Sequence, residues 1–222
     1  MPDTNHLNQT KLTAHAGALH TAPNTAESIR AGLTCIGDGN IEVDVRFSPA
    51  GVPVLAHDAV RDENACTLAE CFRLAKAYPA GINLDLKESR GDLTKIRALA
   101  EQYQLLDRVF FTGIRAKDVP RVRGTGIPYY LNVYPGWLRA RLPCTALSLV
   151  RKAKRLGAVG LNLPYYWART ALVRAAHTHG LEVSAWTVDA PATMRRLLKV
   201  SVDNITTRKP DLLFLAKEGH AH

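Results

Sequence analysis

The feature that most limits how this chain can fold is a regular alternation of strand-like and helix-like segments along its whole length. Short strand-like runs, some of them with alternating apolar and polar residues, are followed by segments whose apolar residues recur at helical spacing. We predict strands over residues 12–16, 40–47, 52–57, 81–87, 108–114, 128–134, 159–164, 181–188 and 202–206, and helices over residues 24–33, 67–78, 93–103, 116–122, 145–156, 168–179, 192–199 and 210–217.

Residues 40–47 and 52–57 are joined by the turn sequence Ser48-Pro49-Ala50-Gly51, so we expect a small β-hairpin there. Apart from the second strand of this hairpin, eight strand–helix units remain, which favours an α/β fold of the closed (β/α)₈ TIM-barrel type. A doubly wound open sheet is the structural alternative. It would need a glycine-rich phosphate turn after an early strand, and the pattern G-x-G-x-x-G is absent from the sequence.

The length favours one domain. The 222 residues suffice for one large core but not for two, and no linker or shift in composition divides them. We therefore expect a single TIM-barrel domain over residues 1–222, in which residues 1–11 form a polar N-terminal extension.

The composition limits the partners and the compartment. The 29 basic and 20 acidic residues give a net charge of +9, which favours anionic partners, but the basic residues are scattered and argue against nucleic acid. The sequence has no apolar run of membrane-spanning length and no signal-peptide pattern, so we expect a cytoplasmic protein without stable membrane insertion. The four cysteines form no C-x-x-C pair, and we expect free thiols that are buried or half-buried.

Polar residues mark the ends of the first predicted barrel strands, where the site of a TIM barrel forms. The first strand ends in His15. The second carries Glu42 and Asp44, which share a face because they are two residues apart, and the third repeats this spacing with Asp85 and Lys87. Three neighbouring carboxylates repel one another unless a cation lies between them, and their oxygens suit Mg²⁺ or Ca²⁺. We expect Lys87 to contact a phosphate oxygen.

The hairpin brings a second histidine to the same end. Folding residues 52–57 back over residues 42–47 places His57 roughly opposite Glu42. Two histidines beside a metal-held phosphate form a plausible acid–base or nucleophile pair, with His15 as the other member. Glu88 competes with Asp85 as the third metal ligand, but its odd spacing places it on the opposite face of the strand.

Taken together, these pieces resemble one family. The order H-x-G, P-N-T, E-x-D, H-D, D-L-K, W-T-V and D-N-I-T-T-x-x-P is similar to that of the glycerophosphodiester phosphodiesterases, of the PLC-like phosphodiesterase TIM-barrel superfamily. Here the pieces are His15-Ala16-Gly17, Pro23-Asn24-Thr25, Glu42-Val43-Asp44, His57-Asp58, Asp85-Leu86-Lys87, Trp186-Thr187-Val188 and residues 203–210. The resemblance implies a divalent metal held by Glu42, Asp44 and Asp85. It also implies catalysis by His15 and His57, phosphate contact from Lys87, and Trp186 as a wall of the substrate pocket.

Three positions depart from the family pattern. Ala16 stands where the family usually has a phosphate-binding arginine, Asp85 where it usually has glutamate, and Pro23 where an acidic residue usually precedes Asn-Thr. The first two departures are features of the related sphingomyelinase D-like phospholipases, which form a cyclic phosphate. The His57-Asp58 pair and the segment from residue 186 to residue 210 fit the glycerophosphodiesterase branch better. His20 is a candidate to replace part of the missing arginine.

We therefore expect a metal-dependent phosphodiester hydrolase. It would cleave glycerophosphodiesters such as glycerophosphocholine or glycerophosphoethanolamine to sn-glycerol 3-phosphate and an alcohol, by two-histidine acid–base catalysis. The expected partner is a small-molecule phosphodiester or a lysophospholipid. Two alternatives stay open: a lyase-type phospholipase D that acts on (lyso)phospholipids through a cyclic phosphate, and a barrel that binds a phosphorylated ligand without turnover. The sequence does not indicate an oligomeric state.

Overall fold

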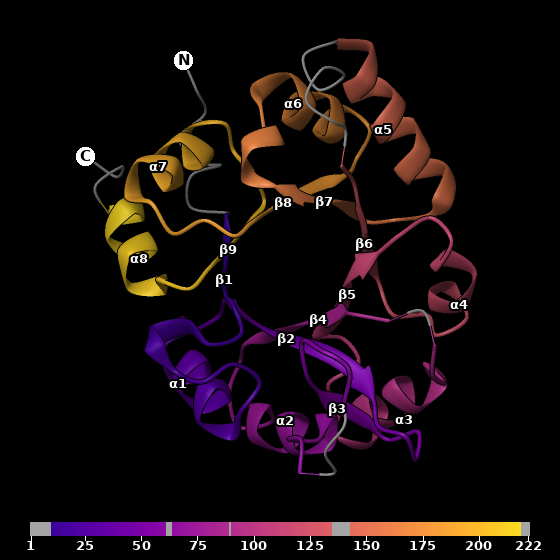
Figure 1. The fold of residues 1–222 in the computed structure, drawn as a ribbon. Helices are drawn as coiled ribbons and strands as arrows, with labels where there is room; N and C mark the ends of the chain where they lie inside the picture. Colours follow the sequence, from indigo (N-terminus) through magenta and orange to yellow (C-terminus); the bar gives the residue numbers. More distant parts are fainter. Residues whose placement is uncertain (1–9, 61–63, 89, 135–142, 219–222) are drawn as a thin grey trace.

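Eight parallel strands close into a ring with helices around it (Figure 1). The computed structural model describes residues 10–60, 64–88, 90–134 and 143–218. The strand order is β1-β9-β8-β7-β6-β5-β4-β2, and β1 also pairs with β2, so the ring is closed and the predicted TIM barrel is confirmed. The barrel strands are β1 (Lys11–Ala14), β2 (Asn40–Phe47), β4 (Gly81–Leu86), β5 (Val109–Ile114), β6 (Tyr129–Asn132), β7 (Gly160–Pro164), β8 (Glu182–Trp186) and β9 (Asn204–Thr207).

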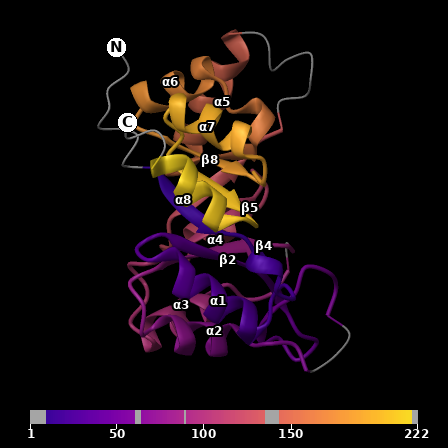
Figure 2. The same cartoon turned by 90° about the vertical axis from the view of Figure 1, so that its left-hand side faces the viewer.

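The helices lie outside the ring and bury their apolar sides against it (Figures 1 and 2). They are α1 (Ala26–Ile36), α2 (Leu68–Ala75), α3 (Thr94–Gln102), α4 (Val119–Arg123), α5 (Pro143–Leu156), α6 (Thr170–Thr178), α7 (Pro191–Lys199) and α8 (Pro210–Glu218). Helix α1 begins two residues later than predicted because Thr25 caps it, accepting a hydrogen bond from the Ser28 backbone N–H at 3.2 Å. Asn24 is thereby released from the helix.

The predicted hairpin is present. Strand β3 (Pro53–Leu55) runs antiparallel to β2, and the Gly51 N–H donates to the Ser48 carbonyl at 2.8 Å in the turn. The partners are Val45 with Leu55 and Phe47 with Pro53, so continuing this register places His57 beside residue 43 rather than residue 42. His57 itself lies two residues beyond the end of β3.

The barrel interior is polar, whereas the outer faces of its strands are apolar. Residues 41, 43 and 45 of β2 are buried on the helix side. Inside the ring, Thr13 donates to Asn204 at 2.6 Å, and Asn204 donates to Ser184 at 2.9 Å. Because buried polar groups must be paired to avoid a desolvation cost, these bonds join β1, β9 and β8 across the interior.

No helix in the described ranges is both long and apolar enough to cross a bilayer.

All four cysteines are free, but Cys144 is exposed and not buried, because it lies on the opposite side of α5 from the buried Ala153. Residues 1–9 of the predicted N-terminal extension lie outside the described residues, and β1 begins at Lys11.

Candidate active site

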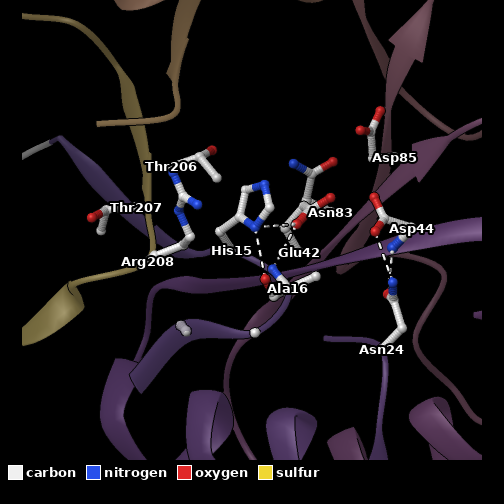
Figure 3. A network of polar contacts seen from close by, with 12 residues as sticks. His15, Ala16, Asn24, Glu42, Asp44, Asn83, Asp85, Thr206, Thr207 and Arg208 are labelled. Atoms are coloured by element: carbon white, nitrogen blue, oxygen red, sulfur yellow. Dashed lines mark hydrogen bonds and ion pairs between the residues drawn. The ribbon is translucent and has the colours of Figure 1, made fainter. Parts of the chain in front are cut away.

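Three carboxylates from two neighbouring strands gather at one end of the barrel. Glu42 and Asp44 extend from β2 and Asp85 from β4, and the parallel register places Asp44 directly beside Asp85. Each offers an oxygen within 4.8 Å of the other two (Figure 3). The structure thus brings together the three residues that the sequence analysis named as metal ligands.

The electrostatics of this cluster follow from its burial. Burial raises the pKa of Glu42 well above its usual range, and the charges of Asp85 and Asp44 raise it further. Two contacts oppose the rise: the Ala16 backbone N–H donates to Glu42 Oε2 at 2.8 Å, and the Lys87 ammonium lies nearby. For Asp44, burial also raises the pKa, but the charge and hydrogen bond of Lys87, together with the Asn24 hydrogen bond and the His15 charge, outweigh it, and the net pKa is lowered.

Lys87 is the cation of the cluster. Its Nζ lies 2.8 Å from Asp44 Oδ1 and 2.5 Å from Asp85 Oδ2. Burial lowers its pKa, but the two carboxylates outweigh this effect and the net pKa is raised, so the side chain stays charged. Lys87 therefore neutralises one of the three negative charges.

Asn24 positions one of the carboxylates. Its Nδ2 donates to Asp44 Oδ2 at 2.7 Å, and the Asp44 backbone N–H donates to Asn24 Oδ1 at 3.0 Å (Figure 3). Asn24 reaches this position with a φ of 61°, a left-handed conformation that asparagine tolerates. Asn24 belongs to the Pro23-Asn24-Thr25 motif, but the motif alone did not predict this contact.

The donor set fits a hard divalent cation. Carboxylate oxygens are the ligands that Mg²⁺ and Ca²⁺ prefer, and the three carboxylates outnumber the one ammonium, Lys87, that contacts them. Glu88, the rival ligand, turns away: its Oε1 accepts from the Phe47 backbone N–H at 2.6 Å. Asp85, and not Glu88, therefore lies with Glu42 and Asp44 in the cluster, as its two-residue spacing predicted.

His15 follows β1 and lies beside Glu42. Its Nδ1 is 2.8 Å from the Ala16 carbonyl oxygen and 3.8 Å from Glu42 Oε2. Because a carbonyl only accepts, Nδ1 carries the proton in the neutral ring, and Nε2 is then the basic nitrogen. In Figure 3 the second ring nitrogen points away from Ala16.

His57 approaches from the hairpin. Its Nδ1 lies 3.0 Å from Asp58 Oδ1, and its backbone carbonyl accepts from Arg46 Nε at 2.9 Å. Two thirds of its side chain is exposed, against 30% for His15. Both histidines line a single cavity of about 420 Å³ together with Glu42, Asp85 and Lys87.

The far wall of this cavity comes from the later strands. Trp186 ends β8 and meets Tyr134 edge to face, with ring centroids 6.1 Å apart. Asn132 and Asn162 line the same wall, and Asn162 Nδ2 donates to Asn132 Oδ1 at 2.9 Å. Tyr165 and Tyr166, which follow β7, are not among the residues lining it.

Position 16 contributes only backbone to the site, because Ala16 is buried and its N–H holds Glu42. His20 is exposed and does not line the cavity. Arg208, near His15 in Figure 3, is held by Asp189 at 2.9 Å and 2.8 Å and is also outside the lining. The cavity does contain an arginine that the sequence analysis did not single out, Arg115, directly after β5.

Comparison with known proteins places the chain in a family. Residues 61–212 match the model of the glycerophosphoryl diester phosphodiesterase family. A glycerophosphodiester phosphodiesterase of Caldanaerobacter subterraneus subsp. tengcongensis is 24% identical over 255 residues, covering 95% of this chain and 99% of the relative. The chain belongs to the glycerophosphoryl diester phosphodiesterase family and is a phosphodiesterase, as its motifs predicted.

Solved structures agree on the fold. A glycerophosphodiester phosphodiesterase of Agrobacterium tumefaciens superposes with a TM-score of 0.74 at 20% identity, covering 92% of this chain and 98% of that one. A phosphodiesterase of Oleispira antarctica, solved in complex with the product sn-glycerol-3-phosphate, gives a TM-score of 0.76 at 18% identity and covers 95% and 98% of the two chains. Both share the barrel architecture with this chain.

Proposed function

We propose that this protein hydrolyses glycerophosphodiesters, such as glycerophosphocholine or glycerophosphoethanolamine, to sn-glycerol 3-phosphate and an alcohol. The observation that carries the proposal is one cavity lined by two histidines beside three clustered carboxylates and a lysine. The product found in the Oleispira antarctica relative is consistent with it. We also propose that the chain acts as a single domain over residues 1–222, in the cytoplasm, on a small molecule and not on nucleic acid.

His15 takes the role of general base in this proposal. Its Nδ1 is fixed on the Ala16 carbonyl, so the basic Nε2 is the atom that accepts a proton from the attacking water. Nδ1 also lies 3.8 Å from Glu42 Oε2, and only 30% of the side chain is exposed, which limits the rotation of the ring. A fixed ring favours proton transfer because the acceptor is already in place.

His57 takes the role of general acid. Water attacks phosphorus, the bond to the alcohol oxygen breaks, and His57 Nε2 gives its proton to the leaving alkoxide. Asp58 orients the ring by contacting Nδ1. His57 reaches the cavity from the hairpin and His15 from the end of β1, so the two rings come from different elements.

Glu42, Asp44 and Asp85 would hold Mg²⁺ or Ca²⁺, which when bound supplies charge stabilisation to the phosphoryl oxygens. Lys87, already between two of these carboxylates, would contact a phosphate oxygen. Trp186 forms a wall against which the substrate packs. Each role uses a residue that lines or adjoins the same cavity.

The test is an assay of alcohol release from glycerophosphocholine with Mg²⁺, with Ca²⁺ and with EDTA. We expect His15→Ala and His57→Ala each to lower kcat about 10²- to 10⁴-fold, while His20→Ala, an exposed histidine outside the cavity, keeps the full rate. Full activity in EDTA, or in His15→Ala, would refute the proposal. Phosphorus NMR of the product separates hydrolysis, which gives a phosphomonoester, from the lyase reaction, which gives a cyclic phosphate.

A further inference from the structure

Strand β5 contains a bulge that changes which of its residues face the cavity. Phe111 pairs with Tyr129 and Ile114 with Leu131, so three steps along β5 match two steps along β6. The extra residue is Gly113, with a φ of +76°. In a regular strand, residues 112 and 114 would share a face and residue 115 would point toward the helices.

The bulge reverses this pattern after residue 112. Thr112 faces the interior and donates to Asn83 at 2.7 Å, whereas Ile114 is fully buried in the apolar core. Arg115 therefore points to the mouth of the barrel, where it lines the cavity with Asp85 and Lys87. A glycine is required at the bulge because a Cβ there would lie 2.4 Å from Asp85 Oδ1.

The carboxylate of Asp118 positions the Arg115 side chain. Its Nε and its backbone N–H each lie 3.3 Å from Asp118 Oδ2, and the Asp118 side chain is only 5% exposed. The Arg115 side chain itself is 57% exposed. A buried carboxylate thus fixes the Nε end of a guanidinium side chain that lines the cavity.

The charges of the site leave room for one more cation. Glu42, Asp44 and Asp85 contribute three negative charges, and Lys87 together with a divalent ion would contribute three positive ones. A phosphodiester then brings one further negative charge, which the protonated His57 and Arg115 can face from the cavity lining, and charges enclosed by protein are costly when unpaired. Among the described residues that line the cavity, Arg115 is the one guanidinium.

We propose that Arg115 binds a phosphate oxygen of the diester substrate, supplying from β5 the guanidinium that Ala16 cannot supply from β1. The planar guanidinium matches phosphate geometry through two parallel hydrogen bonds. This inference rests on the proposed function, since it names a further contact in the same site.

The test measures ligand binding apart from turnover. Calorimetry with sn-glycerol 3-phosphate in the presence of Ca²⁺ compares the wild type with Arg115→Gln, Arg115→Lys and Lys117→Gln. Lys117 is an exposed cation in the same loop and outside the cavity lining, so its variant controls for net charge. We expect Arg115→Gln to weaken binding about 10- to 100-fold, Arg115→Lys to weaken it less, and Lys117→Gln to leave it unchanged, while Ca²⁺ affinity stays constant in all three.

Three results would overturn the inference. One is equal affinity for sn-glycerol 3-phosphate in the wild type and Arg115→Gln, and another is no binding of this ligand by the wild type. The third is a loss in kcat/KM confined to diesters whose alcohol is anionic, which would assign Arg115 to the alcohol and not to the phosphate. If hydrolysis is absent but binding still depends on Arg115, the proposed reaction fails and the phosphate contact stands.

Discussion

Among single residues, Glu42 is a buried carboxylate whose charged form is disfavoured by its surroundings. Glu42 is only 5% exposed. Its carboxylate faces those of Asp44 and Asp85, and one oxygen of each lies within 4.8 Å of the other two. Because its pKa in the folded protein is raised above the ordinary 4.5, the folded state binds a proton that the unfolded state releases earlier. Its contribution to stability is therefore present at low pH and is lost as pH rises through the raised pKa.

Replacing this carboxylate with its neutral amide removes the repulsion. We expect Glu42→Gln to raise the Tm measured in EDTA at neutral pH by about 2–4 °C, the shift that corresponds to about 1 kcal/mol in a chain of this size. The gain shrinks as pH falls toward 4.5. The same variant loses the rise in Tm that Mg²⁺ or Ca²⁺ gives the wild type.

Thermal denaturation in EDTA and in each cation, from acid to neutral pH, checks both parts. Glu101→Gln, which alters an exposed carboxylate paired with Arg97 on α3, is the matched control and should change neither the pH profile nor the response to cation. A lower Tm for Glu42→Gln at neutral pH in EDTA would show that Glu42 stabilises the fold instead of straining it.

Residue spacing predicted the carboxylates well and the cations less well. The two-residue repeat of a strand spaces Glu42 and Asp44 on β2, and likewise Asp85 and Lys87 at the end of β4. Their common face could therefore be predicted from the sequence alone. Arg115 was not, because the bulge at Gly113 breaks that repeat. Asn24 lay in a quoted motif, but its contact with Asp44 joins residues 20 apart and depends on tertiary packing.

At the scale of secondary-structure elements, β5 carries the irregularity with most effect on the site. Gly113 and Gly157 provide a matched comparison, because both have positive φ, +76° and +78°. A Cβ at residue 113 would meet Asp85 Oδ1 and the Leu86 carbonyl at 2.4 and 2.5 Å, whereas at residue 157 the nearest atom is Tyr129 Oη at 3.7 Å.

We expect Gly157→Ala to lower the free energy of unfolding by about 1–2 kcal/mol, the cost of a left-handed alanine. Gly113→Ala should lower it further and also weaken Ca²⁺ binding, because the added methyl displaces Asp85 or the β4 backbone. Urea unfolding and a Ca²⁺ titration measure the two effects. Equal losses of stability and unchanged Ca²⁺ affinity in both variants would contradict the role given to the bulge.

The hairpin shows what sequence patterns leave undetermined in an element. The turn residues 48–51 identified it, but the strand it predicted, residues 52–57, is shortened to Pro53–Leu55. The turn residues predict that two strands pair. Which residues lie opposite one another also depends on the backbone hydrogen bonds that form beyond the turn. The shift of one residue moved His57 from beside Glu42 to beside residue 43 without removing it from the cavity.

At the scale of the whole molecule, the excess of positive charge bears on how substrates arrive. The chain carries a net charge of +9, and a diester with a neutral alcohol is an anion. Such a field raises the encounter rate of anions and fades as salt screens it.

Raising NaCl from about 0.01 M to about 0.1 M shortens the screening length from about 30 Å to about 10 Å. We expect kcat/KM for glycerophosphoinositol, a net anion, to fall at least about threefold over this range. The value for glycerophosphocholine, which is zwitterionic, should fall less. Identical salt profiles for the two substrates would mean that the surface charge serves another purpose.

The overall fold was the most predictable level. A chain with eight strand–helix units and apolar outer strand faces can form only a few folds, and the TIM barrel is one of them. Ring closure was not visible in the pattern, because it depends on a contact between the first strand and the last. Lys11 pairs with Asn204, and the sequence around neither residue predicts that the two segments meet.

That closing contact has a consequence during synthesis. Strand β1 is made first, yet it pairs with β9 from Lys11↔Asn204 to Ala14↔Thr207, so one of its edges has no partner until the ribosome has added the last strand. At roughly 5–20 residues per second, the 193 residues added after Lys11 up to and including Asn204 (204 minus 11) take roughly 10–40 s to translate. For that time a nascent chain presents an unpaired β edge, the kind of surface that chaperones bind and that joins growing chains into aggregates.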